Sequence, residues 1–124
     1  MIKGVGVDII EINRVKNAID RNYKFIEKLF SRREIAYIKA EKTKAQYIAG
    51  RFSAKEAVSK ALGTGFRGFS FKNIEIHKDD LGKPIVVLNG GARAIAESYG
   101  KYQVQLSISH DREKAIAYAV LEVF

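Results

Sequence analysis

The segment from Arg51 to Gly65 reads Arg-Phe-Ser-Ala-Lys-Glu-Ala-Val-Ser-Lys-Ala-Leu-Gly-Thr-Gly and is typical of one amphipathic helix stopped by glycine. It carries a carboxylate, Glu56, about 40° from the apolar Phe52 on the helix wheel. Burying a carboxylate costs several kcal/mol unless something compensates its charge. A pair with Lys60 is one compensation, worth about 0.2–0.5 kcal/mol on an exposed helix. A metal ion with a polyanionic ligand is another, and this segment alone leaves both open.

Outward from this helix, the pattern predicts further helices before it and mostly strands after it. The helix itself is expected over 44–62, and β-branched residues predict a first strand over 2–12. Asn13 is expected to cap a helix over 14–21, and a capping box from Ser31 to Glu34 opens a helix that ends near residue 40. The remaining expected elements are helices over 25–29 and 92–99 and strands over 69–77, 84–88, 102–110 and 115–123.

This order of elements is typical of an α+β fold, with helices packed on one side of a largely antiparallel sheet. The chain of 124 residues is 47% hydrophobic, which fits a single domain over 1–124 with a real core. Its formal net charge of +8 favours an anionic partner: nucleic acid, a membrane surface, an acidic protein or a phosphorylated small molecule. No cysteine and no long apolar run are present, so we expect a cytoplasmic protein without disulfides or membrane spans.

A second carboxylate, Asp8, stands in the middle of the first predicted strand, where aspartate is depleted. A solvated strand face is the simpler interpretation of its position alone. Gly4 and Gly6, expected on the same face, leave room for something to approach closely. Together, Asp8 and Glu56 are the kind of ligand pair that Mg²⁺ takes in proteins, completing its shell with water and phosphate oxygens.

Several cations project from the helix that carries Glu56. Arg51, Lys55 and Lys60 predict a phosphate-binding cradle, and a solvated helix face is the alternative. His110, at the end of a predicted strand, is either a ligand contact or a structural histidine. The stretch Gly82-Lys83-Pro84 is a tight turn by composition, able to hold an extended ligand against its backbone or to be only a turn.

Four segments resemble, in order and spacing, the 4′-phosphopantetheinyl transferase family. They run over residues 4–14, 50–65, 82–84 and 107–111, and the last reads Ser-Ile-Ser-His-Asp. The first two motifs are long and specific, and the resemblance covers essentially the whole chain. The length and the first motif are similar to those of the small, single-domain members of the family, which act on acyl carrier protein.

The resemblance implies that the chain transfers the 4′-phosphopantetheine arm of coenzyme A to a serine of apo acyl carrier protein, in fatty acid biosynthesis, and releases adenosine 3′,5′-bisphosphate. It implies catalytic Mg²⁺ ligands at Asp8 and Glu56 and a catalytic lysine beside the phosphates at Lys60. Small members of the family are homotrimers with sites between subunits, so we expect the same here. The coenzyme A contacts that the resemblance implies are Arg51, His110 and, near the pantetheine arm, Gly82, Lys83 and Pro84.

A basic strip with an apolar anchor is expected on the first two helices: Arg14, Arg21, Lys24, Phe25 and Lys28. Acyl carrier proteins are strongly acidic, so this strip is the predicted docking surface. A solvated basic face is the alternative.

A non-catalytic RNA-binding α+β domain is the rival interpretation. It explains the charge of +8 and the aromatic residues Tyr99 and Tyr102. It does not explain Asp8 and Glu56, because carboxylates repel phosphates unless a cation intervenes. The glycine-aromatic signature of an RNA recognition motif is also missing. We therefore expect neither nucleic acid nor a membrane as partner.

Overall fold

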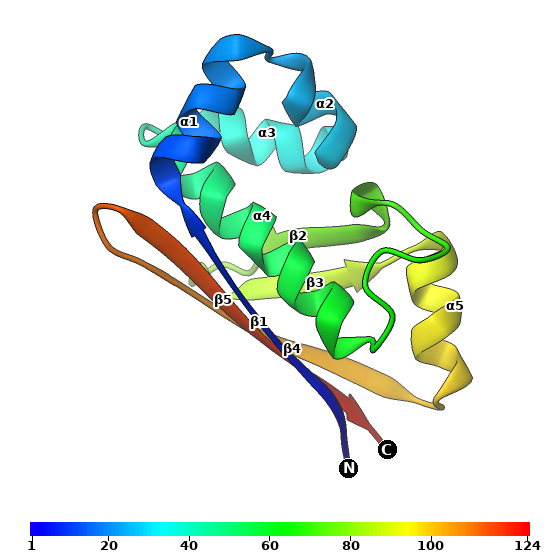
Figure 1. The fold of residues 1–124 in the computed structure, drawn as a ribbon. Coiled ribbons are helices and arrows are strands. Elements are labelled where there is room, and N and C mark those ends of the chain that lie inside the picture. Colours follow the sequence, from blue (N-terminus) through cyan, green and yellow to red (C-terminus); the bar gives the residue numbers. More distant parts are fainter.

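The computed structural model describes residues 1–124, and the predicted α+β fold is confirmed. Strands β1, β5 and β4 form an antiparallel sheet in that order, and β2 and β3 form a separate antiparallel hairpin. Figure 1 shows the helices gathered on one side of the three-stranded sheet. The elements are β1 (Ile2–Glu11), α1 (Ile12–Arg21), α2 (Lys24–Leu29), α3 (Arg32–Ala40), α4 (Lys44–Ala61), the 3₁₀ turn η1 (Phe71–Asn73), β2 (Ile74–Lys78), β3 (Pro84–Leu88), α5 (Gly90–Ser98), β4 (Tyr102–His110) and β5 (Lys114–Val123).

Helix α4 lies directly on β1 because that strand has glycine at the points of contact. A Cβ added at Gly4 would stand 1.9 Å from the carbonyl oxygen of Ala61, and one added at Gly6 would stand 1.9 Å from that of Ala57. Only glycine allows so close an approach of two backbones. The room predicted on this face of the strand is thus filled by the helix itself.

Two apolar clusters make up the core, and α4 belongs to both. The larger lies between α4, the three-stranded sheet, the β2–β3 hairpin and α5, and includes Val58 and Leu121. The smaller lies among α1, α2, α3 and the N-terminal part of α4, and includes Phe30, Ile38 and Ile48. Helix α4 is therefore the central element of the molecule (Figure 1).

The outer face of the three-stranded sheet is apolar and uncovered. Val5, Val7 and Ile9 of β1 point to this side, and their partners in the ladder include Tyr118 and Ile116 of β5. All five side chains count among the exposed large apolar residues of the chain, Ile9 with 59% of its surface accessible. None of the helices combines the length and apolarity that crossing a membrane requires.

Two local predictions were wrong. Asn13 does not cap α1, which begins already at Ile12, because β1 leads straight into the helix and the Ile12 N–H donates to the carbonyl oxygen of Glu113 at 2.8 Å. The strand expected to start before Ile74 is instead a 3₁₀ turn over Phe71–Asn73.

Candidate active site

Asp8 and Glu56 come together where β1 passes under α4. The two glycines of β1 bring the helix down onto the strand, and Asp8 follows Gly6 on the same face. Glu56 lies one residue before Ala57, whose carbonyl oxygen is at the contact. The two carboxylates are close enough for the charge of Asp8 to perturb the ionisation of Glu56. The fold therefore unites two acids that are far apart in the sequence.

The environment of Glu56 disfavours its negative charge. Burial raises the pKa of the Glu56 carboxyl above its usual value, the charge of Asp8 raises it further, and Lys60 opposes both. A bound cation would relieve this repulsion. The chain contains no group of three or more His, Cys, Asp or Glu side chains arranged to hold a metal. A metal here would thus have two protein carboxylates, a donor set that fits Mg²⁺ with water and phosphate oxygens completing its octahedron.

Lys60 stands at the edge of the carboxylate pair. Its Nζ donates to the carbonyl oxygen of Val7 at 3.0 Å and lies 3.7 Å from Asp8 Oδ1. The helical pair with Glu56, considered from the sequence as an alternative, is not formed within 4.0 Å, because the lysine reaches across to the strand. Its side chain is 53% exposed and can therefore meet an anion arriving from solvent.

Arg51 and His110 line one pocket of about 160 Å³ between the N-terminal half of α4 and the end of β4. The Arg51 guanidinium lies over the Tyr47 ring, 4.3 Å from its centroid, and Arg51 Nε is buried without a hydrogen-bond partner. His110 Nδ1 is 2.8 Å from Gln46 Nε2. Buried donors are normally satisfied, so an unpartnered guanidinium nitrogen beside a pocket fits a ligand that accepts hydrogen bonds.

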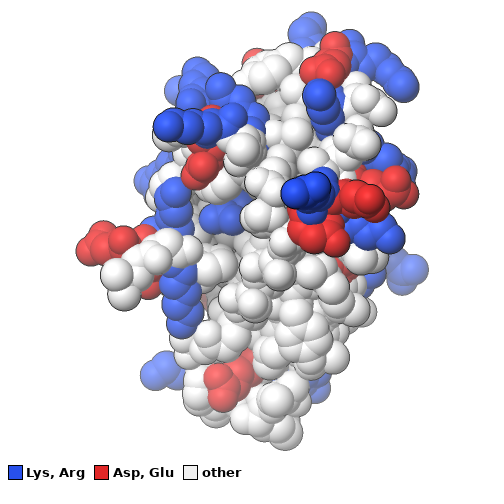
Figure 2. All heavy atoms as spheres, turned by 90° about the vertical axis from the view of Figure 1, so that its left-hand side faces the viewer, with Lys and Arg blue, Asp and Glu red and all other residues white.

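A larger pocket of about 530 Å³ shares Thr43 and Gln46 with the first. None of its charged lining residues forms an ion pair, and none is acidic. In the view of Figure 2, Lys and Arg gather over the upper part of the face, while the lower part is mostly uncharged. The larger pocket would attract a polyanion. The cations that line it are Lys16, Lys42, Lys44 and Arg112.

The turn Gly82-Lys83-Pro84 lies apart from the carboxylates within one chain. It connects β2 to β3, and Gly82 takes a positive φ of 86° that favours glycine. Lys83 and Pro84 line a groove of about 270 Å³ against residues 102–105 of β4. Neither Asp8 nor Glu56 lines that groove, and no cation of α4 lines it.

The predicted docking strip lies on α1 and α2, next to the N-terminal half of α4. Arg14, Phe25 and Phe52 share a mainly apolar pocket of about 150 Å³. The Phe25 and Phe52 rings stack with centroids 6.4 Å apart, and Phe52 precedes Glu56 by one helical turn. The apolar anchor of the strip thus leads towards the carboxylate pair. The other cations of the strip, all exposed, are Arg21, Lys24 and Lys28.

Comparison with known proteins decides the family. Residues 4–119 match the model of the 4′-phosphopantetheinyl transferase superfamily. The chain belongs to this superfamily. It is 99% identical over 124 residues to the holo-[acyl-carrier-protein] synthase of Clostridium acetobutylicum, covering 100% of both chains. To the synthase of Clostridium novyi it is 57% identical over 123 residues, covering 99% of this chain and 89% of the relative.

Solved structures agree with this assignment. A crystal structure of a holo-(acyl-carrier-protein) synthase from Bacillus anthracis, in complex with CoA (3′,5′-ADP), is 42% identical with a TM-score of 0.85 and covers 100% of this chain and 99% of that one. The prediction of an α+β enzyme of the phosphopantetheinyl transferase family is confirmed.

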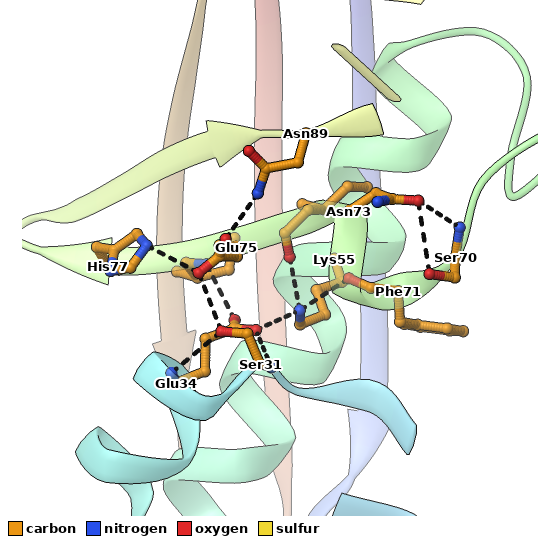
Figure 3. A network of polar contacts seen from close by, with 11 residues as sticks. Ser31, Glu34, Lys55, Ser70, Phe71, Asn73, Glu75, His77 and Asn89 are labelled. Carbon is orange, nitrogen blue, oxygen red and sulfur yellow. Dashed lines mark hydrogen bonds and ion pairs between the residues drawn. The ribbon is translucent and has the colours of Figure 1, made fainter. Parts of the chain in front are cut away.

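One predicted phosphate contact of this transferase was wrong. Lys55 lies in the core with 0% of its side chain exposed (Figure 3). Its Nζ donates to Glu34 Oε1 at 2.8 Å and to the carbonyl oxygens of Phe71 and Ile74 at 2.9 and 2.5 Å. Burial lowers the pKa of the Lys55 ammonium, and Glu34 opposes that shift. All three of its N–H groups are used within the protein, so Lys55 cannot also hold coenzyme A.

The partner of Lys55 could not be found by sequence reasoning. The capping box of α3 is confirmed, because Ser31 N–H donates to Glu34 Oε1 at 3.0 Å and Ser31 Oγ accepts from the Glu34 N–H at 3.3 Å. Glu34 Oε2 also accepts from the N–H of Ile76 at 3.0 Å. In the sequence, the capping box is a sufficient reason for a glutamate at position 34. No sequence pattern indicates that Glu34 also contacts a lysine of another helix.

Proposed function

We propose that the chain transfers the 4′-phosphopantetheine arm of coenzyme A to a serine of apo acyl carrier protein, with Mg²⁺ held by Asp8 and Glu56. Membership in the superfamily supports the transfer. The observation that supports the metal is the pairing of two carboxylates, one with a raised pKa, beside a half-exposed lysine. That the Bacillus anthracis relative is described in complex with CoA supports coenzyme A as the substrate.

In the proposed reaction the serine oxygen bonds to the β-phosphorus of coenzyme A. The bond from that phosphorus to the bridging oxygen breaks, so adenosine 3′,5′-bisphosphate leaves with the bridging oxygen. Mg²⁺, when bound, supplies neutralisation of the charge on the pyrophosphate. Lys60 adds a positive charge at the same edge. Glu56, one of the two carboxylates at this edge, accepts the serine proton as the general base.

The remaining coenzyme A contacts fall into two groups in this proposal. Arg51 and His110, with the adjoining cationic pocket, bind the phosphorylated nucleotide end. The turn Gly82-Lys83-Pro84 contacts the pantetheine arm. Because the groove at that turn contains neither carboxylate of the same chain, we place the complete site between two subunits.

The subunits associate, in this proposal, through the apolar outer face of the three-stranded sheet. Val5, Val7 and Ile9 form an exposed stripe beside Ile116 and Tyr118. Contiguous apolar surfaces of this kind mark association sites. A homotrimer, as in small members of the family, would bury one such face per subunit around a common axis.

The acidic carrier protein docks, in this proposal, on the basic strip of α1 and α2. Its cations steer the encounter, and Phe25 provides an apolar anchor by stacking on Phe52, which lies one helical turn from Glu56. The cations of the strip are Arg14, Arg21, Lys24 and Lys28.

Mass spectrometry of apo acyl carrier protein tests the function directly. Incubation with this protein, coenzyme A and Mg²⁺ should add the mass of one phosphopantetheine arm, and a chelator should abolish the addition until Mg²⁺ is restored. Glu56→Gln should retain coenzyme A binding and lose most turnover. A carrier protein of unchanged mass would overturn the proposal, and stabilisation by RNA rather than by coenzyme A would favour the non-catalytic alternative. The expected cytoplasmic location stays a prediction.

A further inference from the structure

The buried pair of Lys55 and Glu34 needs an explanation beyond stability. Both side chains are almost completely inaccessible, at 0% and 2%. Replacing a buried ion pair by apolar residues of similar volume is often neutral or stabilising, because two charges no longer leave water. Stability alone therefore does not explain why these two charges lie in the core. Lys55 is, however, the residue directly before Glu56 on α4.

The bonds of Lys55 are directional and reach three other segments. Its acceptors come from α3, from η1 and from the residue at the start of β2 (Figure 3). Glu34 is fixed in turn by the N–H groups of Ser31 and Ile76. The ammonium group is thus held by acceptors that are themselves part of regular structure, and α4 cannot turn about its axis without breaking these bonds.

The opposite side of α4 is restrained by a single side-chain hydrogen bond to β1, from the half-exposed Lys60 Nζ to the Val7 carbonyl oxygen at 3.0 Å. There the helix meets β1 through Ala57 and Ala61 against Gly4 and Gly6. These small residues allow a close approach, but their contacts are apolar or involve backbone alone and make no hydrogen bond between helix and strand. The glycine contacts set the distance between helix and strand, and the three buried bonds of Lys55 restrain the rotation of the helix more firmly than the one solvent-accessible bond of Lys60.

We infer that Lys55 and Glu34 form a positioning pair, which fixes the rotation of α4 and thereby holds Glu56 opposite Asp8. The inference rests on the proposed function, in which these two carboxylates bind the metal. A carboxylate roughly 6 Å from the helix axis moves about 1 Å for a rotation of about 10°. Mg²⁺–oxygen distances are held to about 0.2 Å. A small rotation therefore removes one of the two protein ligands.

The test replaces both charges together, with the variant Glu34→Gln/Lys55→Met, so that neither is left alone in the core. Mn²⁺, the probe for the metal site, is titrated in the presence of coenzyme A and its binding followed by electron paramagnetic resonance. We expect Mn²⁺ to bind 10- to 100-fold more weakly than to the wild type, the usual effect of losing a group that orients a metal ligand. Coenzyme A binding without metal should stay within about twofold, since the pair does not contact it.

Leu88→Ala is the matched control, because Leu88 is buried in the same core but makes no bond to the pair. It should lower Tm and leave Mn²⁺ affinity unchanged. If the double variant binds Mn²⁺ as tightly as the wild type, the positioning role is refuted while the transfer activity stands. If the wild type binds no Mn²⁺ and modifies no carrier protein, the proposed function itself is wrong.

If the double variant does not fold, Glu34→Asp provides the same comparison. It keeps the charge and shortens the reach by one methylene, so it should weaken Mn²⁺ binding in the same direction. Unchanged Mn²⁺ affinity in a folded Glu34→Asp protein would overturn the inference.

Discussion

Gly6→Ala tests whether the close approach of α4 to β1 is what joins the two carboxylates. The added Cβ would stand 1.9 Å from the Ala57 carbonyl oxygen and 2.9 Å from both Ala57 C and Ala61 N. Real Cβ contacts are essentially never shorter than 3.0 Å, so 1.9 Å must become at least 3.0 Å and the helix must retreat by about 1.1 Å. The atoms in the way belong to the backbone, which cannot turn aside.

Two effects should follow from this displacement. Overpacking costs typically about 1–3 kcal/mol, and a backbone clash belongs at the upper end, so we expect Tm to fall by roughly 10 °C. Glu56 moves with α4 while Asp8 stays on β1, and a misplacement of about 1 Å at a catalytic site can cost about 10²-fold in rate. The Mg²⁺ concentration for half-maximal activity should rise as well, because one ligand is displaced.

The assay is transfer to apo carrier protein over a range of Mg²⁺ concentrations, at a temperature chosen below the measured Tm of both proteins. Gly68→Ala is the control, because its added Cβ meets no atom within 4 Å although the backbone there has a positive φ of 83°. It should cost about 1–2 kcal/mol of strain and leave the Mg²⁺ dependence unchanged. If Gly6→Ala keeps the wild-type Tm and Mg²⁺ dependence, the account of how the fold assembles the site is wrong.

Three further predictions concern charge and association. Because burial raises the pKa of Glu56, the folded, metal-free chain holds the Glu56 proton more tightly than the unfolded chain, and the free energy of unfolding should fall as pH rises from about 4.5 through the raised pKa. Glu56→Gln should remove this pH-dependent component, which is measured as Tm against pH in the presence of a chelator. Identical pH profiles for the two proteins would contradict the assignment. Reversing Arg14 and Arg21 to Glu should raise KM for carrier protein in steady-state kinetics and leave KM for coenzyme A unchanged, whereas equal effects on both would exclude this docking surface. Val7→Lys should place a charge opposite Tyr118 on the outer sheet face and lower the mass measured by light scattering to that of one subunit, and an unchanged assembly would exclude that face as the interface.

The strands were predictable from the sequence where one face is buried and the other is not. β4 occupies the bounds expected for it, because its apolar side chains alternate with polar ones. Helix α4 is different, since the middle of the molecule surrounds it. Its buried residues include Ser53, Lys55 and Ser59, so no single stripe marks the side that faces the core. Its bounds could be predicted, but not which of its cations reach solvent.

This difference explains the outcome for the site. Asp8 and Glu56 stood out because acids are unusual among apolar residues, and the fold brings them together. Arg51 and Lys55 are one turn apart and look equivalent in sequence, yet only Arg51 borders a pocket. What separates them is Glu34, a residue of another helix that the sequence explains as a cap. The spacing of residues along the sequence does not predict contacts of this kind between distant segments.

The division of the core has a consequence for hydrogen exchange. The smaller cluster holds α1, α2 and α3 against the first turns of α4, whereas the larger cluster includes Ala54, Ala57 and Ala61 and the strands. Local opening of the smaller cluster should therefore expose amides of the helical layer while those around Asp8 and Glu56 stay protected. A carrier protein that docks on α1 and α2 would therefore slow amide exchange in the helical layer more than around the two carboxylates.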